Sequence, residues 1–459
     1  MVGLSPRNQL EELQNWLQGT SRKPLILRGA RQVGKSTLVR LFAEAQGRPL
    51  TEVNLERYPQ LGPVFASNDP RGILNQIEAL PNVSPVSHES ILFLDEIQAV
   101  PEAIPALRYF HEDLGLLPVV AAGSLLDFVL AEHTFSMPVG RIQYLHVGPM
   151  TFTEFLGALG ETKLKDTIGS FRPGAEIGPV VHTRLLELLR SYYFVGGMPE
   201  AVQVFAKDRR FAAVSAVHNS IIETYRDDFP KYAGSRNLAR LLNVFHFAAR
   251  NVGNKVKYSN ISRDDHSGTI KRDIDLLSMA RVVTKVMHTH ASGLPLQAGL
   301  DEKNYKLLFL DVGLMNALCG LGWNVLSSMS DAQLINEGAI AEQFIGQHLQ
   351  QLLVGSPNRE MTYWLREGRA NNAEIDFLIA LDGKIVPIEV KAGNRGSLRS
   401  LHQFMGEKSA PFAVRFDTNL PSEQTVETTI RTSGRETPVK YQLLSFPLYL
   451  AEKLPDLLT

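Results

Sequence analysis

Cysteine is almost missing from this sequence of 459 residues, and so is any long uncharged apolar run. The single Cys319 excludes an internal disulfide framework and is typical of the reducing cytoplasm, where we expect the protein. No stretch is long enough to cross a bilayer, and the first residues lack the apolar core of a secretory signal. We therefore expect no membrane association.

An excess of charge of one sign is also missing, because 47 Lys and Arg residues face 48 Asp and Glu residues. This balance excludes a polybasic coat protein for nucleic acid, although a local basic channel is compatible with it. The content of 44% hydrophobic and 21% charged residues is ordinary for a globular protein. The length is sufficient for about three domains.

A glycine-rich stretch between an apolar strand and a helix is the strongest motif. Residues 29–36 match G-x-x-x-x-G-K-[ST], in the strand–loop–helix context that this motif requires. Its backbone N–H groups would face phosphate oxygens, Lys35 would reach the β and γ phosphates, and Ser36 would hold Mg²⁺. The predicted ATP site consists of Gly29, Ala30, Arg31, Gln32, Val33, Gly34, Lys35, Ser36 and Thr37.

Two later strands end in polar residues that suit the same site. Residues 91–94 predict a buried strand that is followed by Asp95 and Glu96. We expect Asp95 to complete the Mg²⁺ shell and Glu96 to polarise the attacking water. Ser124 follows the next strand and would contact the γ-phosphate or the water, with the N-cap of a helix as an equal alternative.

Arg141 precedes a further predicted strand. It would act as an arginine finger on the γ-phosphate, in cis or from a neighbouring copy, and the alternative is a structural salt bridge. Strands alternate with helices from residue 24 to about residue 150, which predicts an α/β fold with a parallel, doubly wound sheet.

Two helix-rich parts follow. Residues 151–235 predict a helical lid, and residues 236–300 predict a winged-helix-like module. Lys271 and Arg272 lie in the first turn of its candidate recognition helix, where they would face DNA, but two aspartates lie close by. DNA contact and a purely structural or protein-binding role remain equally open.

The stretch EIDFLIALDGKIVPIEVKAG predicts a hairpin with an Asp-Gly turn. Counting outward from the turn places Asp376 opposite Glu389, and Glu374 opposite Lys391. Like charges that face each other across two strands repel, and a hard divalent cation between them would remove the repulsion. The alternative is a solvated face with cross-strand ion pairs.

Two resemblances extend this interpretation. The segments GARQVGKST, LFLDEIQ, AAGSLL, PMTFTEFL, YYFVGGMPEAV and KLLFLDVGLMNAL resemble bacterial and archaeal AAA+-type P-loop ATPases that carry a C-terminal domain of unknown function. Residues 335–418 resemble the PD-(D/E)XK nuclease core in the order of their elements and in Glu342, Asp376 and Glu389-Val390-Lys391. Ile375 stands where the strict nuclease pattern has proline.

The nuclease resemblance implies a metal-dependent phosphodiesterase site. Asp376, Glu389 and the carbonyl of Val390 would coordinate Mg²⁺ or Mn²⁺, and Glu342 would complete the shell directly or through water. Lys391 would orient the metal-bound water or stabilise the developing charge.

We thus expect four parts, in which ATP is bound and hydrolysed and DNA is a partner that is cleaved or bound. The competing hypothesis is a nucleotide-driven switch that binds DNA or a protein and never cleaves. The sequence leaves the oligomeric state open, a homo-oligomer included. The predicted parts are a P-loop AAA+-type ATPase domain at 1–150, a lid at 151–235, a winged-helix-like module at 236–300 and a PD-(D/E)XK nuclease-like domain at 301–459.

Overall fold

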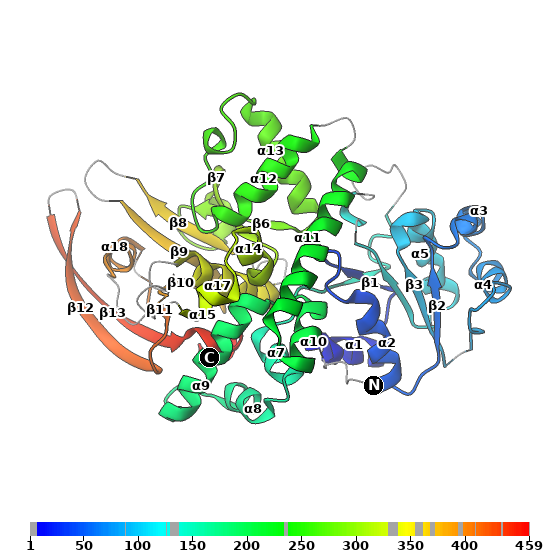
Figure 1. The fold of residues 1–459 in the computed structure, drawn as a ribbon, viewed down its shortest axis with the longest axis horizontal. Coiled ribbons are helices and arrows are strands. Elements are labelled where there is room, and N and C mark those ends of the chain that lie inside the picture. Colours follow the sequence, from blue (N-terminus) through cyan, green and yellow to red (C-terminus); the bar gives the residue numbers. More distant parts are fainter. Residues whose placement is uncertain are drawn as a thin grey trace. The chain divides into compact units, whose positions relative to one another are not determined.

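The computed structural model divides the chain into two compact units (Figure 1). The first comprises Met1–Met150 with Met279–Arg281, and the second comprises Thr151–Ser278 with Val282–Thr459. The residues that the structure describes are 7–87, 89–124, 126–128, 137–233, 237–328, 338–353, 361–367, 372–392, 398–408, 410–432 and 435–458.

A five-stranded parallel sheet forms the centre of the first unit, in the order β2-β3-β4-β1-β5. The predicted parallel α/β sheet is therefore confirmed. Because all strands point the same way, their carboxyl ends meet at one edge of the sheet, where ligands bind in such folds. The strands are β1 (Leu25–Arg28), β2 (Leu50–Asn54), β3 (Ile91–Asp95), β4 (Val119–Ala122) and β5 (Gln143–His146).

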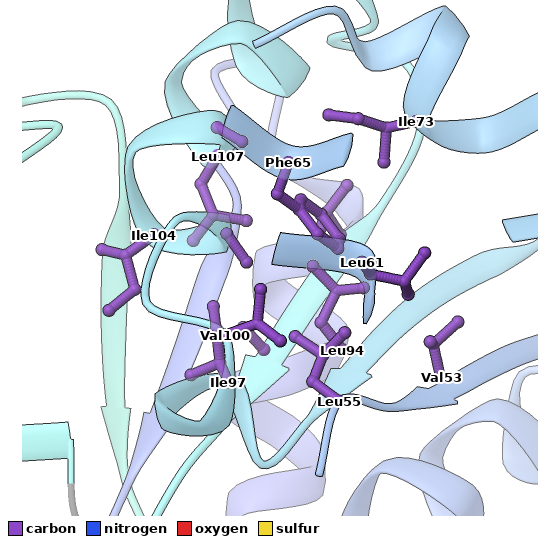
Figure 2. Close-up of a cluster of buried hydrophobic side chains, with 14 of the residues drawn as sticks. Val53, Leu55, Leu61, Phe65, Ile73, Leu94, Ile97, Val100, Ile104 and Leu107 are labelled. Atoms are coloured by element: carbon purple, nitrogen blue, oxygen red, sulfur yellow. The ribbon is translucent and has the colours of Figure 1, made fainter. Parts of the chain in front are cut away.

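Buried aliphatic side chains hold this sheet against its helices (Figure 2). Leu94 of β3 and Val53 of β2 pack with Phe65 and Leu107 from the surrounding helices, and all four are fully buried. Each buried side chain of this size contributes about 1.5–3 kcal/mol relative to an exposed one. The helices of this unit are α1 (Gln9–Gln18), α2 (Lys35–Ala45), α3 (Gly62–Ala66), α4 (Pro70–Glu78) and α5 (Ala103–Asp113).

The second unit begins with a helical region and ends with a large mixed sheet. Its helices are α7 (Phe152–Ala158), α8 (Thr162–Ser170), α9 (Pro179–Val195), α10 (Pro199–Asp208), α11 (Phe211–Ala233), α12 (Leu238–Arg250), α13 (Ser267–Met279), α14 (Val312–Leu318), α15 (Trp323–Ser328), α17 (Gly338–Leu353), α18 (Arg399–Lys408) and α19 (Leu454–Leu457). No helix of the described chain is both long and apolar enough to span a membrane.

The eight strands of the second sheet run in the order β12-β13-β11-β10-β9-β8-β6-β7. Strand β6 follows the candidate recognition helix of the predicted winged-helix-like module, and it pairs with β7 on one side and with β8 on the other. It is thus part of this sheet. The strands are β6 (Val283–Thr289), β7 (Leu300–Phe309), β8 (Thr362–Arg366), β9 (Ala373–Leu381), β10 (Lys384–Val390), β11 (Phe412–Asp417), β12 (Ser422–Thr432) and β13 (Arg435–Pro447).

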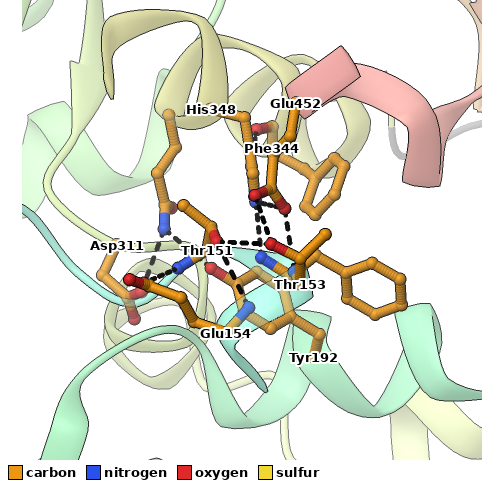
Figure 3. Close-up of polar contacts among 10 residues, drawn as sticks. Thr151, Thr153, Glu154, Tyr192, Asp311, Phe344, His348 and Glu452 are labelled. Carbon is orange, nitrogen blue, oxygen red and sulfur yellow. Dashed lines mark hydrogen bonds and ion pairs between the residues drawn. The ribbon is translucent and has the colours of Figure 1, made fainter. Parts of the chain in front are cut away.

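A buried polar network joins helices that lie far apart in the sequence (Figure 3). His348 accepts a hydrogen bond from the backbone N–H of Phe152 at 2.9 Å and donates to the carbonyl of Phe344 at 2.7 Å. Glu452 accepts from both the backbone N–H and the hydroxyl of Thr153, at 2.8 and 2.6 Å. The network therefore fixes the start of α7 to α17 and to the C-terminal segment.

Asp311 holds the turn after α9 against the start of α14. Its carboxylate accepts hydrogen bonds from the backbone N–H groups of Gly197 at 2.6 Å and Leu314 at 3.0 Å. Gly196 has a φ of +70°, and a Cβ at this position would lie 2.1 Å from the Asp311 carboxylate. Two of the segments that carry the family resemblance therefore contact each other, through the glycine pair of YYFVGGMPEAV and the aspartate of KLLFLDVGLMNAL.

Candidate functional site

The phosphate-binding motif forms the loop between β1 and α2, as its sequence predicts. Gly34 adopts a left-handed backbone at the N-cap of α2, with a φ of +88°. The Lys35 ammonium is buried and donates to the carbonyls of Gly29 at 3.0 Å and Ala30 at 2.8 Å. Burial lowers the pKa of Lys35 to about 8, although Glu96 and Asp95 oppose the shift. An anionic phosphate would restore the charge that burial penalises.

Asp95 and Ser36 meet at the carboxyl end of β3. The Ser36 hydroxyl donates to the Asp95 carboxylate at 2.8 Å, which brings together the two residues that were predicted to hold Mg²⁺. Burial raises the pKa of Asp95, and the hydrogen bond from Ser36 opposes this shift. A hydroxyl and a carboxylate side by side are donors of the type that Mg²⁺ takes in nucleotide sites.

Glu96 lies next to Asp95 with a left-handed backbone, at a φ of +53°. The amide of Gln98 donates to its carboxylate at 2.5 Å. A Cβ on Gly123 would lie 2.3 Å from the amide oxygen of Gln98, so the Gln98 side chain lies directly against the backbone of Gly123. Ser124 follows Gly123 at the end of β4 and is buried. Glu96 after β3 and Gly123 after β4 therefore both lie next to Gln98, a residue that the sequence analysis did not single out.

Arg141 forms an ion pair with Glu112 at 3.0 Å, and its side chain is half exposed. This contact fits the structural alternative, and an arginine this exposed is equally accessible to a neighbouring copy. A second arginine was missed by the sequence reasoning. Arg7 is buried and donates to the carbonyl of Val33 in the phosphate loop at 3.0 Å and to that of Gly148 at 2.7 Å.

The acidic hairpin is β9–β10, and its register near the turn is the predicted one. Lys384 faces Leu381, and pairing continues to Ile388 opposite Phe377. The sequence did not predict β8, which pairs with β9 antiparallel. Two residues of β9, Asp376 and Phe377, oppose one residue of β8. This is a β-bulge, a feature that often redirects a side chain beside a functional site.

Within this bulge, Asp376 accepts a hydrogen bond from the backbone N–H of Val390 at 2.8 Å. The Lys391 ammonium contacts Glu389 at 2.5 Å. Glu374, which was predicted to lie opposite Lys391, forms an ion pair with Lys306. The paired positions of β9 and β10 extend from the turn to Phe377 and Ile388, so they end before the predicted pair.

Lys306 of β7 lies at the centre of the acidic cluster, and the sequence gave no signal for it. Its ammonium lies 3.0 Å from Glu342 of α17 and 3.9 Å from Asp376, besides its contact with Glu374. Its side chain is only 1% exposed. Burial alone would lower the pKa of Lys306, but the carboxylates around it raise the pKa instead. We refer to Glu342, Glu374, Asp376, Glu389, Lys306 and Lys391 as the acidic cluster.

The acidic cluster has more carboxylates than ammonium groups. Its four carboxylates and two lysines leave an excess of two negative charges when all are ionised. Burial, together with the nearby Asp376 carboxylate, raises the pKa of Glu342 to about 7 and that of Glu389 to about 8. One oxygen of Glu389, Oε2, is buried and has no hydrogen-bond partner among the described residues. The donor chemistry fits a hard divalent cation.

The same side chains are not arranged as a complete set of metal ligands. In the described part of the chain, no three His, Cys, Asp or Glu side chains lie close enough together to hold a metal ion. The Lys306 ammonium lies among these carboxylates, where a metal ion would have to bind.

Comparison with protein families divides the chain into three matching segments. Residues 21–156 match the AAA domain family. Residues 186–325 and 337–431 match two domains of unknown function, DUF8612 and DUF4143. No protein of curated function matches the chain. The segment that carries the P-loop motif thus matches the AAA domain family, in agreement with the resemblance seen in the sequence.

Solved structures give a weaker similarity. The Aeropyrum pernix ORC1 protein, in complex with DNA, is 17% identical with a TM-score of 0.29, over 70% of this chain and 94% of that one. The Aeropyrum pernix ORC2 protein, in ADPNP–ADP complexes, is 13% identical with a TM-score of 0.35, over 71% and 96%. The Thermotoga maritima RuvB Holliday junction branch migration motor is 16% identical with a TM-score of 0.28, over 61% and 90%. Scores this low carry no argument about function.

Proposed function

We propose that the protein hydrolyses ATP in its first unit and uses the nucleotide to control a nucleic-acid-directed second unit. The observation that carries the first part is the meeting of Lys35, Ser36 and Asp95 at the carboxyl ends of β1 and β3. Ser36 and Asp95 would hold Mg²⁺, which when bound offsets the charge of the β and γ phosphates.

Other residues of the chain would bind the phosphates and activate the attacking water. The Lys35 ammonium exchanges its two carbonyl partners for phosphate oxygens, and the N–H groups of the loop donate to the same phosphates. Glu96 orients the attacking water and accepts its proton, once Gln98 releases the carboxylate. Ser124 is placed to contact the γ-phosphate or the water, and Arg141 of a neighbouring copy would stabilise the charge of the transition state.

A phosphate-release assay with two variants tests this part. Lys35→Ala should lose both ATP binding and turnover, whereas Glu96→Gln should bind ATP and turn it over at least ~100-fold more slowly. Normal turnover by the Glu96→Gln protein would refute the assignment of the base.

For the second unit we propose metal-dependent cleavage of DNA phosphodiester bonds by the acidic cluster. The order α17, β8, β9, β10, α18, β11 brings a helical glutamate, the bulged Asp376 and the Glu389–Lys391 pair together. Asp376, Glu389 and Glu342 would hold Mg²⁺ or Mn²⁺, which when bound acidifies a water. Lys391 orients that water and offsets charge on the phosphate.

Supercoiled plasmid and single-stranded circular DNA, with Mn²⁺ or Mg²⁺ and with or without ATP, are the substrates for the test. The wild type should nick or linearise at least one of them, and Lys391→Ala and Asp376→Ala should not. Cleavage that persists in both variants would place the nuclease activity elsewhere, in a contaminant or another site.

A nucleotide-driven switch that binds DNA or a protein without cleaving is the second candidate. The observation that favours it is the Lys306 ammonium among the carboxylates, where no three acidic or His/Cys side chains of the described residues form a metal site. ATP turnover without any cleavage in the same assay would support the switch.

A further inference from the structure

The Lys306 ammonium is held by carboxylates from two elements. Glu342 comes from α17, and Glu374 and Asp376 come from β9. Two of these three, Glu342 and Asp376, are residues that the proposed function gives to the metal. A lysine ammonium is a compact point charge on a flexible four-carbon stem, so it can both occupy a cation position and leave it.

Ion pairing by Lys306 does not satisfy the cluster. When all six groups are ionised, an excess of two negative charges remains, and Glu389 Oε2 still has no partner among the described residues. A carboxylate oxygen that is buried without a partner costs about 1–3 kcal/mol or more, so a purely structural ion-pair network would not be expected to leave one. The cluster is therefore built for more positive charge than its lysines supply.

The two side chains have different surroundings. The Glu342 carboxylate lies close to the backbone of Gly253, where a Cβ would lie 2.3 Å from it. In contrast, the Lys306 ammonium lies 5.1 Å from the ring centre of Tyr363. The Tyr363 hydroxyl is buried and has no hydrogen-bond partner among the described residues, so it offers an acceptor to a displaced ammonium.

We propose that Lys306 is a built-in competitor of the divalent metal: its ammonium occupies the cation position between Glu342 and Asp376, and a metal ion binds there only when the ammonium withdraws. The inference rests on the proposed metal site and deepens it. The cation position would hold the Lys306 ammonium at rest and a divalent cation in the active form.

Isothermal titration calorimetry of the full-length, nucleotide-free protein with MnCl₂ tests the proposal. Two variants remove the competitor: Lys306→Met, and Lys306→Met combined with Glu374→Gln, which removes the lysine together with a paired carboxylate and so keeps the charge balance. Asp376→Asn identifies the heat that belongs to the acidic cluster. Lys255→Met is the matched control, because the backbone of Lys255 pairs with that of Lys306 while its side chain forms an ion pair with Glu367.

Both competitor-free variants should bind Mn²⁺ at the cluster at least about tenfold more tightly than the wild type, because a unit charge has been removed from contact distance. Lys255→Met should match the wild type. If the wild type binds Mn²⁺ through Asp376 and neither variant binds it more tightly, Lys306 is not a competitor, although the metal site stands. If neither the wild type nor the variants bind Mn²⁺ at the cluster, the metal site itself is wrong, and this inference with it.

Discussion

Gly346 of α17 sets the distance between this helix and the sheet, and its replacement by alanine is the sharpest test of the packing at the acidic cluster. A Cβ at this position would lie 2.4 Å from Leu308 Cδ1 and 3.0 Å from Phe377 Cζ. Both neighbours are themselves buried. Gly346 lies one helical turn after Glu342, so the two residues share a face of α17.

The magnitude follows from two opposing terms. Alanine is better than glycine in a helix interior by about 1 kcal/mol, which favours the variant. Overpacking a buried site costs about 1–3 kcal/mol, and the contact below 3.0 Å places this site toward the upper end. We expect Gly346→Ala to lower the free energy of unfolding by about 1–2 kcal/mol. Gly169 of α8 has open space around its Cα, so Gly169→Ala should raise that free energy by about 0.5–1 kcal/mol.

Urea unfolding of the two variants, followed by the fluorescence of Trp323 and Trp364 in the second unit, measures both effects. Because the displaced helix carries Glu342 with it, Gly346→Ala should also weaken Mn²⁺ binding at the acidic cluster. Stabilisation by both substitutions, or an equal effect of both, would refute the close approach of α17 to β7 and β9.

Three further predictions concern single residues. Asp311→Ala leaves two buried backbone N–H groups without their acceptor and should cost about 2–4 kcal/mol in chemical unfolding, against about 1 kcal/mol for Asn237→Ala at an exposed N-cap. Burial lowers the pKa of His348 to about 4, below its unfolded value near 6.5, so its contribution of up to about 3 kcal/mol is present above pH 6.5 and lost as the pH falls toward 4. Unfolding curves of His348→Gln should accordingly depend less on pH than those of the wild type. If Arg141 acts as an arginine finger, Arg141→Ala should lower ATP turnover by at least about tenfold, whereas Glu112→Ala should leave turnover unchanged. Equal effects of the two substitutions on turnover would show that the ion pair is only a surface contact.

Local sequence patterns were sufficient to predict those parts of the site that are built from residues close together in the sequence. The phosphate loop needs only a strand, two glycines and a helix start, and Lys35 and Ser36 lie where that pattern placed them. Asp95 could be predicted because it ends a fully apolar strand, and parallel strands end at one edge of a sheet. The register of the β9–β10 hairpin near its turn followed from the Asp-Gly pair alone.

Contacts between distant segments were beyond such patterns. Lys306 precedes Glu342 by 36 residues, and nothing in the sequence of β7 indicated that this lysine would pair with a glutamate of α17. The β-bulge at Asp376 depends on pairing with β8, whose short sequence gave no signal. The ion pair of Glu374 with Lys306 likewise joins two strands whose pairing no local pattern predicts. Arg7 and Gln98 were missed for the same reason, since each acts on a residue of the ATP site through a contact that no spacing rule encodes.

Hydrogen bonds between α17 and the end of β7 determine how the Lys306 ammonium would leave the acidic cluster. The amide of Gln343 holds both the N–H and the carbonyl of Phe309, at 2.8 and 2.7 Å, and Gln347 accepts from the N–H of Val312 at 3.0 Å. The end of β7 is thus fixed to α17, the helix that carries Glu342. Because strand and helix are held together, their backbones cannot separate to release the lysine without breaking buried hydrogen bonds. Withdrawal of the ammonium must therefore be a rotation of the side chain, and hydrogen exchange of the β7 amides should be the same with and without Mn²⁺.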